Sequence, residues 1–227
     1  MAKDTKHSSG DENLEAIQNT LGRTEQFIEE NQKSVSIIIG AIIFIVVGYF
    51  AYQKFYVAPL EEEAQSQIFM AQNYFAQDSF KLALDGDGFN EGFLSVADDY
   101  SMTNTGGLAN YYAGISYLHL GEFDNAIDAL KSFDAGDDMV TTMALGAIGD
   151  AYVEKGQIED AVTYFKKASD RKTNEFITPV YLMKLGLAYE NLGKKDAAFE
   201  AYNTIKVDFP KSNEARQVEK YITRTQI

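Results

Sequence analysis

Hydrophobic residues are distributed unevenly along this chain, and the longest uninterrupted run lies near its beginning. Between Lys33 and Lys54 there is no charged side chain, and most of the residues there are isoleucine, valine, glycine or aromatic. A helix over the 20 residues 34–53 would be about 30 Å long, which matches one hydrocarbon core. The run therefore predicts a transmembrane helix at 34–53. The alternative is a buried core helix, which is rarely apolar on all sides over this length.

The residues on either side of the run predict an uncleaved anchor and its orientation. The 33 residues before it are acidic, unlike the short basic start of a secretory signal. Within about 20 residues of the run, Arg23 and Lys33 lie on the N-terminal side and only Lys54 on the C-terminal side. Positive residues favour the cytoplasmic side, so we expect the N-terminus in the cytoplasm and residues 60–227 outside it.

Residues 1–33 are expected to form a short cytosolic tail with one amphipathic helix. Such a helix could pack on the cytosolic surface of a partner or lie among the lipid headgroups. The residues that define its apolar stripe recur at a spacing near 3.5: Leu14, Ile17, Leu21, Thr24 and Ile28.

The region after the run contains one pattern three times. The pattern is Gly-x-x-Tyr-x-x-x-Gly, followed by an alanine and, four residues later, by a large apolar or aromatic residue. The copies are displaced by 35 and then by 37 residues. They consist of Gly114, Tyr117, Gly121, Ala126 and Leu130; Gly149, Tyr152, Gly156, Ala161 and Phe165; and Gly186, Tyr189, Gly193, Ala198 and Tyr202, with Pro210 after the last.

Each residue type in this pattern has a physical role in a pair of packed helices. The first glycine and the alanine allow two helices to approach closely, and the tyrosine fills the space between them. The second glycine ends the first helix in a left-handed cap. In this order of small, aromatic, glycine and alanine positions, the pattern resembles the tetratricopeptide repeat, a helix–turn–helix unit of about 34 residues.

The predicted fold class is therefore all-α: a single transmembrane helix followed by a tetratricopeptide-like α-solenoid at 60–227. Loops at 134–138 and 171–175 would absorb the extra residues between repeats. In the first pair, Leu60–Leu84 is expected to be one long helix, and Asn90–Tyr100 a second, shorter one. The expected parts are a degenerate first helix pair at 60–100, repeats near 107–140, 142–175 and 179–212, and a capping helix at 213–224.

Charge and residue usage argue against several functions. Residues 60–227 carry 15 Lys and Arg against 27 Asp and Glu, a net charge of −12, which disfavours binding to nucleic acid. Neither His7 nor His119 has a second histidine four residues away. The stretch beginning at Asp85 starts like a calcium loop but lacks the required glycine and glutamate. We expect no catalytic residue, metal or cofactor, and hence no enzyme.

Tetratricopeptide arrays usually bind proteins on the concave face formed by the first helix of each repeat. The residues at the usual ligand-facing positions are mostly apolar, and they include no lysine or arginine. Such a surface suits extended or partly unfolded chains. The helix at 60–84 could instead fill this groove. The candidate residues are Leu108, Tyr111, Ile115, Leu118, Met143, Val153, Val180, Met183 and Leu187.

Two local stretches carry a more specific resemblance. They are Gly92-Phe-Leu-Ser-Val-Ala-Asp-Asp-Tyr100 and Leu108-Ala-Asn-Tyr-Tyr-Ala-Gly-Ile-Ser-Tyr117. With the single span before them, they resemble the YfgM-like family of ancillary translocon subunits in bacterial inner membranes. The tail containing Thr24-Glu-Gln-Phe-Ile28 is similar to versions from Bacteroidetes-type bacteria.

This resemblance implies an inner-membrane protein whose repeat domain lies in the periplasm. The implied partners are the SecYEG channel, the PpiD-like membrane-anchored chaperone, and secretory or outer-membrane proteins as they emerge. Two other functions fit the same sequence. One is a scaffold subunit of another envelope secretion or assembly complex, and the other is an import-type receptor whose repeats face the cytosol.

Overall fold

The computed structural model describes residues 31–134, 136–171 and 174–227, and all regular secondary structure in these ranges is helical. The chain divides into two compact units, residues 1–56 and 57–227. The all-α prediction is confirmed for the described ranges. The amphipathic helix predicted between Leu14 and Ile28 lies outside them.

The described part of the first unit is dominated by α2, Gln32–Tyr52, which leads into a π-helical turn, η1, at Gln53–Val57. None of the α2 residues is buried, although most are large and apolar. A fully exposed apolar helix is unfavourable in water and favourable in a bilayer. By length and composition, α2 is apolar enough to cross a membrane.

The second unit begins with three helices, α3 (Ala58–Ala76), α4 (Phe80–Asp85) and α5 (Phe93–Asp99). The prediction of one helix over Leu60–Leu84 is wrong, because the chain turns at Asp78, whose φ is 56°. Aspartate tolerates this left-handed conformation better than most residues. The Ser79 amide also donates to the Tyr74 carbonyl at 2.9 Å, a bond typical of a helix end.

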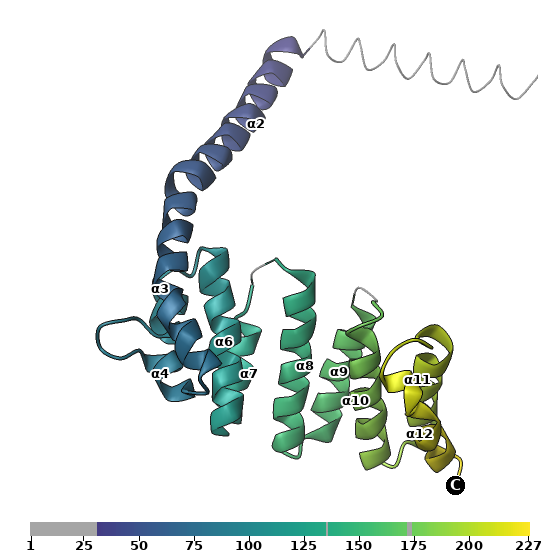
Figure 1. Ribbon diagram of the computed structural model, residues 1–227. Helices are drawn as coiled ribbons and strands as arrows, with labels where there is room; N and C mark the ends of the chain where they lie inside the picture. The colour runs from purple at the N-terminus through teal and green to yellow at the C-terminus, as the bar shows by residue number, and fades with distance from the viewer. Residues whose placement is uncertain (1–30, 135, 172–173) are drawn as a thin grey trace, which may run out of the picture. The chain divides into compact units, whose positions relative to one another are not determined.

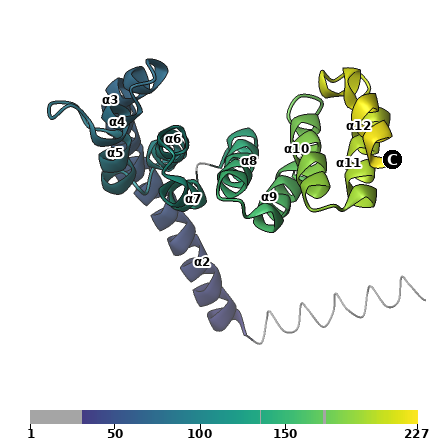
Figure 2. The same cartoon turned by 90° about the horizontal axis from the view of Figure 1, so that it is seen from below.

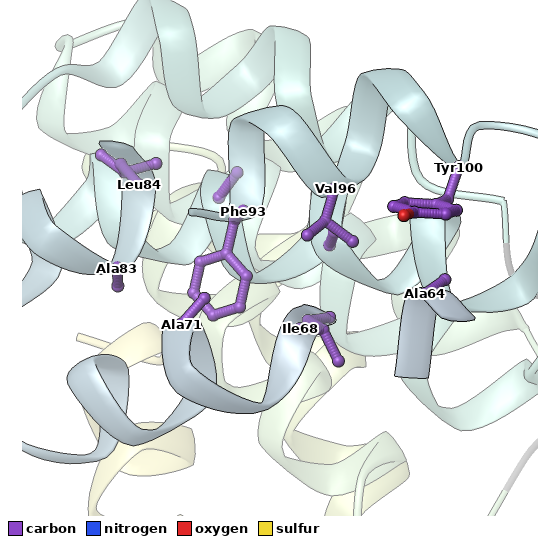
Figure 3. Packing of buried hydrophobic residues seen from close by; sticks show 10 residues of the cluster. Ala64, Ile68, Ala71, Ala83, Leu84, Phe93, Val96 and Tyr100 are labelled. Atoms are coloured by element: carbon purple, nitrogen blue, oxygen red, sulfur yellow. The ribbon is translucent and has the colours of Figure 1, made fainter. Parts of the chain in front are cut away.

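The turn at Asp78 allows α4 to fold back into a shared core. Ala64, Ile68 and Ala71 of α3 meet Ala83 and Leu84 of α4 in one buried cluster. The same cluster contains residues of α5, and Figure 3 shows the ring of Phe93 close to Ala71. The fully buried residues of α3 are therefore two alanines and one isoleucine, and aromatic side chains supply most of the volume around them.

Three helical hairpins follow, each built from a first helix and a second helix that packs against it. Figures 1 and 2 show them side by side in chain order. Thr103 caps the first helix of the first hairpin, and Asp137 caps the first helix of the second. In each case the side chain accepts at least one hydrogen bond from a backbone N–H group of the helix. The helices are α6 (Asn104–Leu120) and α7 (Phe123–Lys131), α8 (Asp138–Glu154) and α9 (Ile158–Asp170), and α10 (Thr178–Asn191) and α11 (Lys195–Asp208).

A glycine in each first helix receives a large side chain from the second helix. A Cβ on Gly114 would lie 2.4 Å from Leu130, one on Gly149 2.5 Å from Phe165, and one on Gly186 2.2 Å from Tyr202. No alanine fits at these distances without movement of the partner. The turns after these helices use Gly121, Gly156 and Gly193, whose φ values of 76°, 72° and 70° are left-handed.

The chain ends in a short 3-10 turn, η2 (Glu214–Arg216), and in α12 (Val218–Thr225). Val218 and Ile222 are buried against α11, and the remaining surface of α12 is polar. The Arg224 guanidinium donates to the Glu190 carboxylate, with 3.0 Å between Nε and Oε1. A polar outer face is what the last helix of a solenoid requires.

Candidate protein-binding surface

The predicted binding residues of α6 lie in two different surroundings. Tyr111, Ile115 and Leu118 are half-buried and pack against the core that α7 and α8 share. Leu108 instead lines a hollow of about 450 Å³. Three of these four side chains therefore serve mainly as contacts between repeats. Leu108 alone borders an open space.

The predicted binding residues of α8 and α10 also differ in how exposed they are. Met143 is partly exposed and Val180 is half-buried. Val153 and Leu187 are 40 % and 41 % exposed, and they lie together. Met183 is only 8 % exposed and belongs to the C-terminal core around Tyr202, so its prediction as a surface residue is wrong.

A hollow of about 260 Å³, which we call the α8–α10 hollow, contains Val153 and Leu187. Residues of α8, α9 and α10 form its walls, and most of the lining side chains are apolar. No described residue of α3 lines it, so the helix predicted at 60–84 does not fill this part of the inner face. The lining consists of Asp150, Val153, Ile158, Phe165, Lys184, Leu187, Ala188 and Asn191.

One ion pair stands among these apolar side chains. The Lys184 ammonium lies 2.7 Å and 2.6 Å from the two carboxylate oxygens of Asp150. Burial raises the pKa of the Asp150 carboxyl, and the bond from Lys184 opposes this effect without cancelling it. The Lys184 nitrogen also lies 5.8 Å from the ring centre of Phe165. The hollow is therefore apolar, and its two internal charges neutralise each other.

The prediction from sequence omits Lys184, because the expected ligand-facing position on α10 is one residue earlier, at Met183. On α10 the side chains of Lys184 and Leu187 line the hollow, whereas that of Met183 points into the core. A signal was present in the sequence: Asp150 and Lys184 are 34 residues apart, about one repeat, and carry opposite charges. Two oppositely charged residues at this spacing can form an ion pair between the first helices of neighbouring repeats.

The second hollow, which Leu108 borders, lies where α3, α6 and the start of α8 meet. Glu61 of α3 accepts hydrogen bonds from the Thr105 hydroxyl at 2.6 Å and from the Thr105 amide at 3.2 Å. This contact joins α3 to the first turn of α6. Half of the polar side chains of the lining are amides, and the lining consists of Glu61, Gln65, Ile68, Gln72, Asn104, Thr105, Leu108, Asp137 and Val140.

The described residues contain no group of three or more His, Asp or Glu side chains that could hold a metal ion. The His119 ring stacks on Phe80, with 4.2 Å between ring centres. Asp87, in the stretch that begins like a calcium loop, directs its carboxylate to groups of its own loop and to Tyr74. These side chains have structural partners within the fold.

Comparison with known proteins agrees with this geometry. Two models of the tetratricopeptide repeat match the chain, one over residues 108–134 and the other over residues 147–213. The second unit is a tetratricopeptide-repeat solenoid. This architecture typically serves as a non-catalytic scaffold for protein–protein interaction. No curated protein sequence matches the chain.

Solved structures with similar folds include the MamA protein, with a TM-score of 0.53 and 19 % identity over 73 % of this chain and 87 % of that one. Another contains the nearly identical TPR-like repeats of a Podosopora anserina protein described as a kinesin light chain. Its TM-score is 0.52 and its identity 14 %, over 73 % of this chain and 86 % of that one. At these identities the likeness concerns the fold alone.

Proposed function

We propose that this protein is a membrane-anchored accessory subunit of the Sec translocon in a bacterial inner membrane. In this proposal α2 crosses the bilayer, residues 1–33 lie in the cytoplasm and the solenoid lies in the periplasm. Its partners are the SecYEG channel, a PpiD-like chaperone and emerging secretory or outer-membrane proteins. The exposed apolar α2, the excess of Lys and Arg before it and the resemblance to the YfgM-like family support this assignment.

The observation that carries the binding role is the composition of the α8–α10 hollow. Val153 and Leu187 offer partly exposed apolar surface, while Lys184 and Asp150 cancel each other's charge. Such a surface favours apolar segments without selecting for one charge pattern. Emerging chains of many sequences share this property, because their future core residues are still exposed.

The partners are tested by purifying the tagged full-length protein in mild detergent after crosslinking, followed by mass spectrometry. We expect recovery of channel subunits and of a membrane-anchored chaperone of the prolyl-isomerase type. Recovery of a different envelope assembly, without these proteins, would contradict the translocon assignment. That result would instead identify the protein as a scaffold of the recovered complex.

The orientation is tested separately with a reporter fused after Ile227. We expect a reporter that functions only outside the cytoplasm to be active, because the basic residues before α2 favour a cytoplasmic N-terminus. A reporter active only inside the cytoplasm would reverse the topology. It would then favour an import-type receptor whose repeats face the cytosol.

A further inference from the structure

The loop between α4 and α5 holds a phenylalanine almost entirely in solvent. Phe89 is 98 % exposed, more than any other large apolar residue in the described part of the chain. In both views of the molecule this loop stands clear of the stacked helices (Figures 1 and 2). The loop lies outside the α8–α10 hollow and outside the three glycine-marked hairpins, so the proposed function leaves it without a role.

The loop is ordered by the carboxylate of Asp87. One oxygen accepts the backbone N–H groups of Phe89 at 2.8 Å and of Asn90 at 2.7 Å. The other accepts the Tyr74 hydroxyl at 2.7 Å and the Asn90 side-chain amide at 3.0 Å. These bonds, that from Tyr74 above all, hold the pKa of Asp87 well below its usual range, so the carboxylate stays charged.

Two glycines close the base of the loop. A Cβ on Gly92 would lie 2.1 Å from the Leu84 carbonyl oxygen, and one on Gly86 2.2 Å from the Asn90 carbonyl oxygen. Gly86 also has a φ of 80°. The backbone around Phe89 is therefore fixed by its own contacts, and the phenyl ring takes no part in them. Aromatic side chains held on an ordered backbone are the usual anchors of protein interfaces.

The charges around Phe89 indicate what it contacts. Residues 80–100 contain one lysine and five acidic residues, and Lys81 is bound to Asp85 at 2.6 Å. This negative field opposes approach to an anionic lipid surface. It also opposes a second copy of this acidic domain. It favours a different protein whose surface is positive at the point of contact.

We propose that Phe89 is an anchor residue, which the ordered loop at 86–92 inserts into an apolar, basic-rimmed pocket of a different protein. The anchor is separate from the α8–α10 hollow and does not depend on what that hollow binds. One chain would thus contact a stable partner through Phe89 and a variable partner through the inner face of its repeats.

The test replaces Phe89 with the photo-crosslinker p-benzoyl-phenylalanine in the full-length protein in its own membrane. The matched control places the same group at Phe176, which is 85 % exposed on another loop. We expect one discrete adduct from position 89, absent from position 176, whose crosslinked peptide contains apolar residues and Lys or Arg. Its yield should fall several-fold in high salt because exposed charges are screened. An adduct to lipid, to a second copy, or equally from both positions would overturn the proposal.

Binding to the purified partner then measures the anchor directly. We expect Phe89→Ala to weaken binding about thirtyfold, as is typical of an interface hot spot. Asp87→Ala, which frees the loop, should also weaken it, while thermal unfolding of Phe89→Ala stays unchanged. Wild-type affinity in Phe89→Ala would overturn the proposal. A specific partner that is not a translocon subunit would support the anchor, and the Sec assignment would still be decided by the pull-down, so the two proposals fail independently.

Discussion

The helix group α3–α5 and the three hairpins after it pack in the same solenoid with different residues. In the hairpins, a glycine in the first helix receives a large side chain from the second, as Gly149 receives Phe165. In α3 the corresponding small residues are Ala64 and Ala71, which share a core with Phe93. The glycine pattern therefore marks the closest approach of two backbones. It is not required for a helix to join the stack.

The two regions also end their first helices differently. Each hairpin uses a left-handed glycine, whereas α3 ends at a left-handed aspartate and continues into the extra helix α4. The added helix and the ordered loop at 86–92 have no counterpart in the hairpins. The N-terminal region thus gains a surface that a regular repeat does not provide.

The largest expected effect tests whether the buried cores of both regions stabilise the fold. Phe93→Ala and Phe165→Ala should each lower the free energy of unfolding by about 3–5 kcal/mol, because both side chains are buried. Denaturant unfolding measures this, with the exposed Lys166→Ala as control. Hydrogen exchange should rise near each substituted residue first, since repeats contact mainly their neighbours. A loss below about 1 kcal/mol for Phe93→Ala would show that the core of α3–α5 adds little to the stability of the solenoid.

A smaller effect is expected where the two regions differ in sequence. Gly149→Ala should destabilise the domain by about 1–3 kcal/mol, because the new Cβ would lie 2.5 Å from the Phe165 ring. Adding Phe165→Leu, the residue type found at Leu130 of the first hairpin, should make the double variant more stable than the sum of the two single changes predicts. Simple additivity would show that the glycine and the ring do not compete for space.

The ion pair in the α8–α10 hollow has a pH-dependent effect. The folded state binds a proton at Asp150 at higher pH than the unfolded state, so the contribution of Asp150 to stability falls as pH rises above about 3.8. Lys184→Met removes the positive charge that partly offsets the burial of Asp150. The pKa of Asp150 in the folded state then rises further, and more stability is lost as the pH rises. Both side chains are more than a third exposed, so we expect only about 0.5–1 kcal/mol at neutral pH.

The measurement for this pair is the free energy of unfolding of wild type and Lys184→Met between pH 3 and pH 8, with Lys166→Met as control. The difference between the first two proteins should be largest at neutral pH and should shrink toward pH 3, where Asp150 is protonated in both states. A difference that is constant across this range would show that Lys184 acts through packing alone.

The smallest effect is expected at Tyr202, whose ring packs against Gly186 in the third hairpin. Its hydroxyl is buried and accepts or donates no hydrogen bond of standard geometry among the described residues, and the Arg224 guanidinium beside it donates to Glu190. Tyr202→Phe should therefore change the free energy of unfolding by no more than about 0.5 kcal/mol. Thermal and denaturant unfolding measure it. A loss above about 2 kcal/mol would show that the hydroxyl is hydrogen-bonded in solution.

The sequence predicts the hairpins well because their constraints are local and repeated. Gly114, Gly149 and Gly186 must be small wherever two helices touch at this distance, so they recur at the repeat period. The apolar run at 34–53 is equally easy to recognise in the sequence, because a membrane-spanning helix needs both this length and this composition. Neither inference requires knowledge of contacts between distant residues.

The remaining features depend on such contacts. The turn at Asp78 is stabilised by the packing of α4 against α3 and α5. The helical pattern of hydrophobic residues in the sequence, by contrast, continues through this turn without a break. Whether Met183 or Lys184 faces the hollow depends on how α10 is rotated, and Tyr181 sets part of that rotation by packing on Gly146. A rotation by one residue moves a side chain by about 100° around a helix.

We propose that this protein binds other proteins through the inner face of its repeats while α2 anchors it in a membrane. The most direct test places a photo-crosslinker at Leu187, in the α8–α10 hollow, and at Glu200, on the exposed side of α11, in the full-length protein during active secretion. We expect adducts with emerging secretory proteins from position 187 and none from position 200. Equal crosslinking from both positions, or none from position 187, would contradict it.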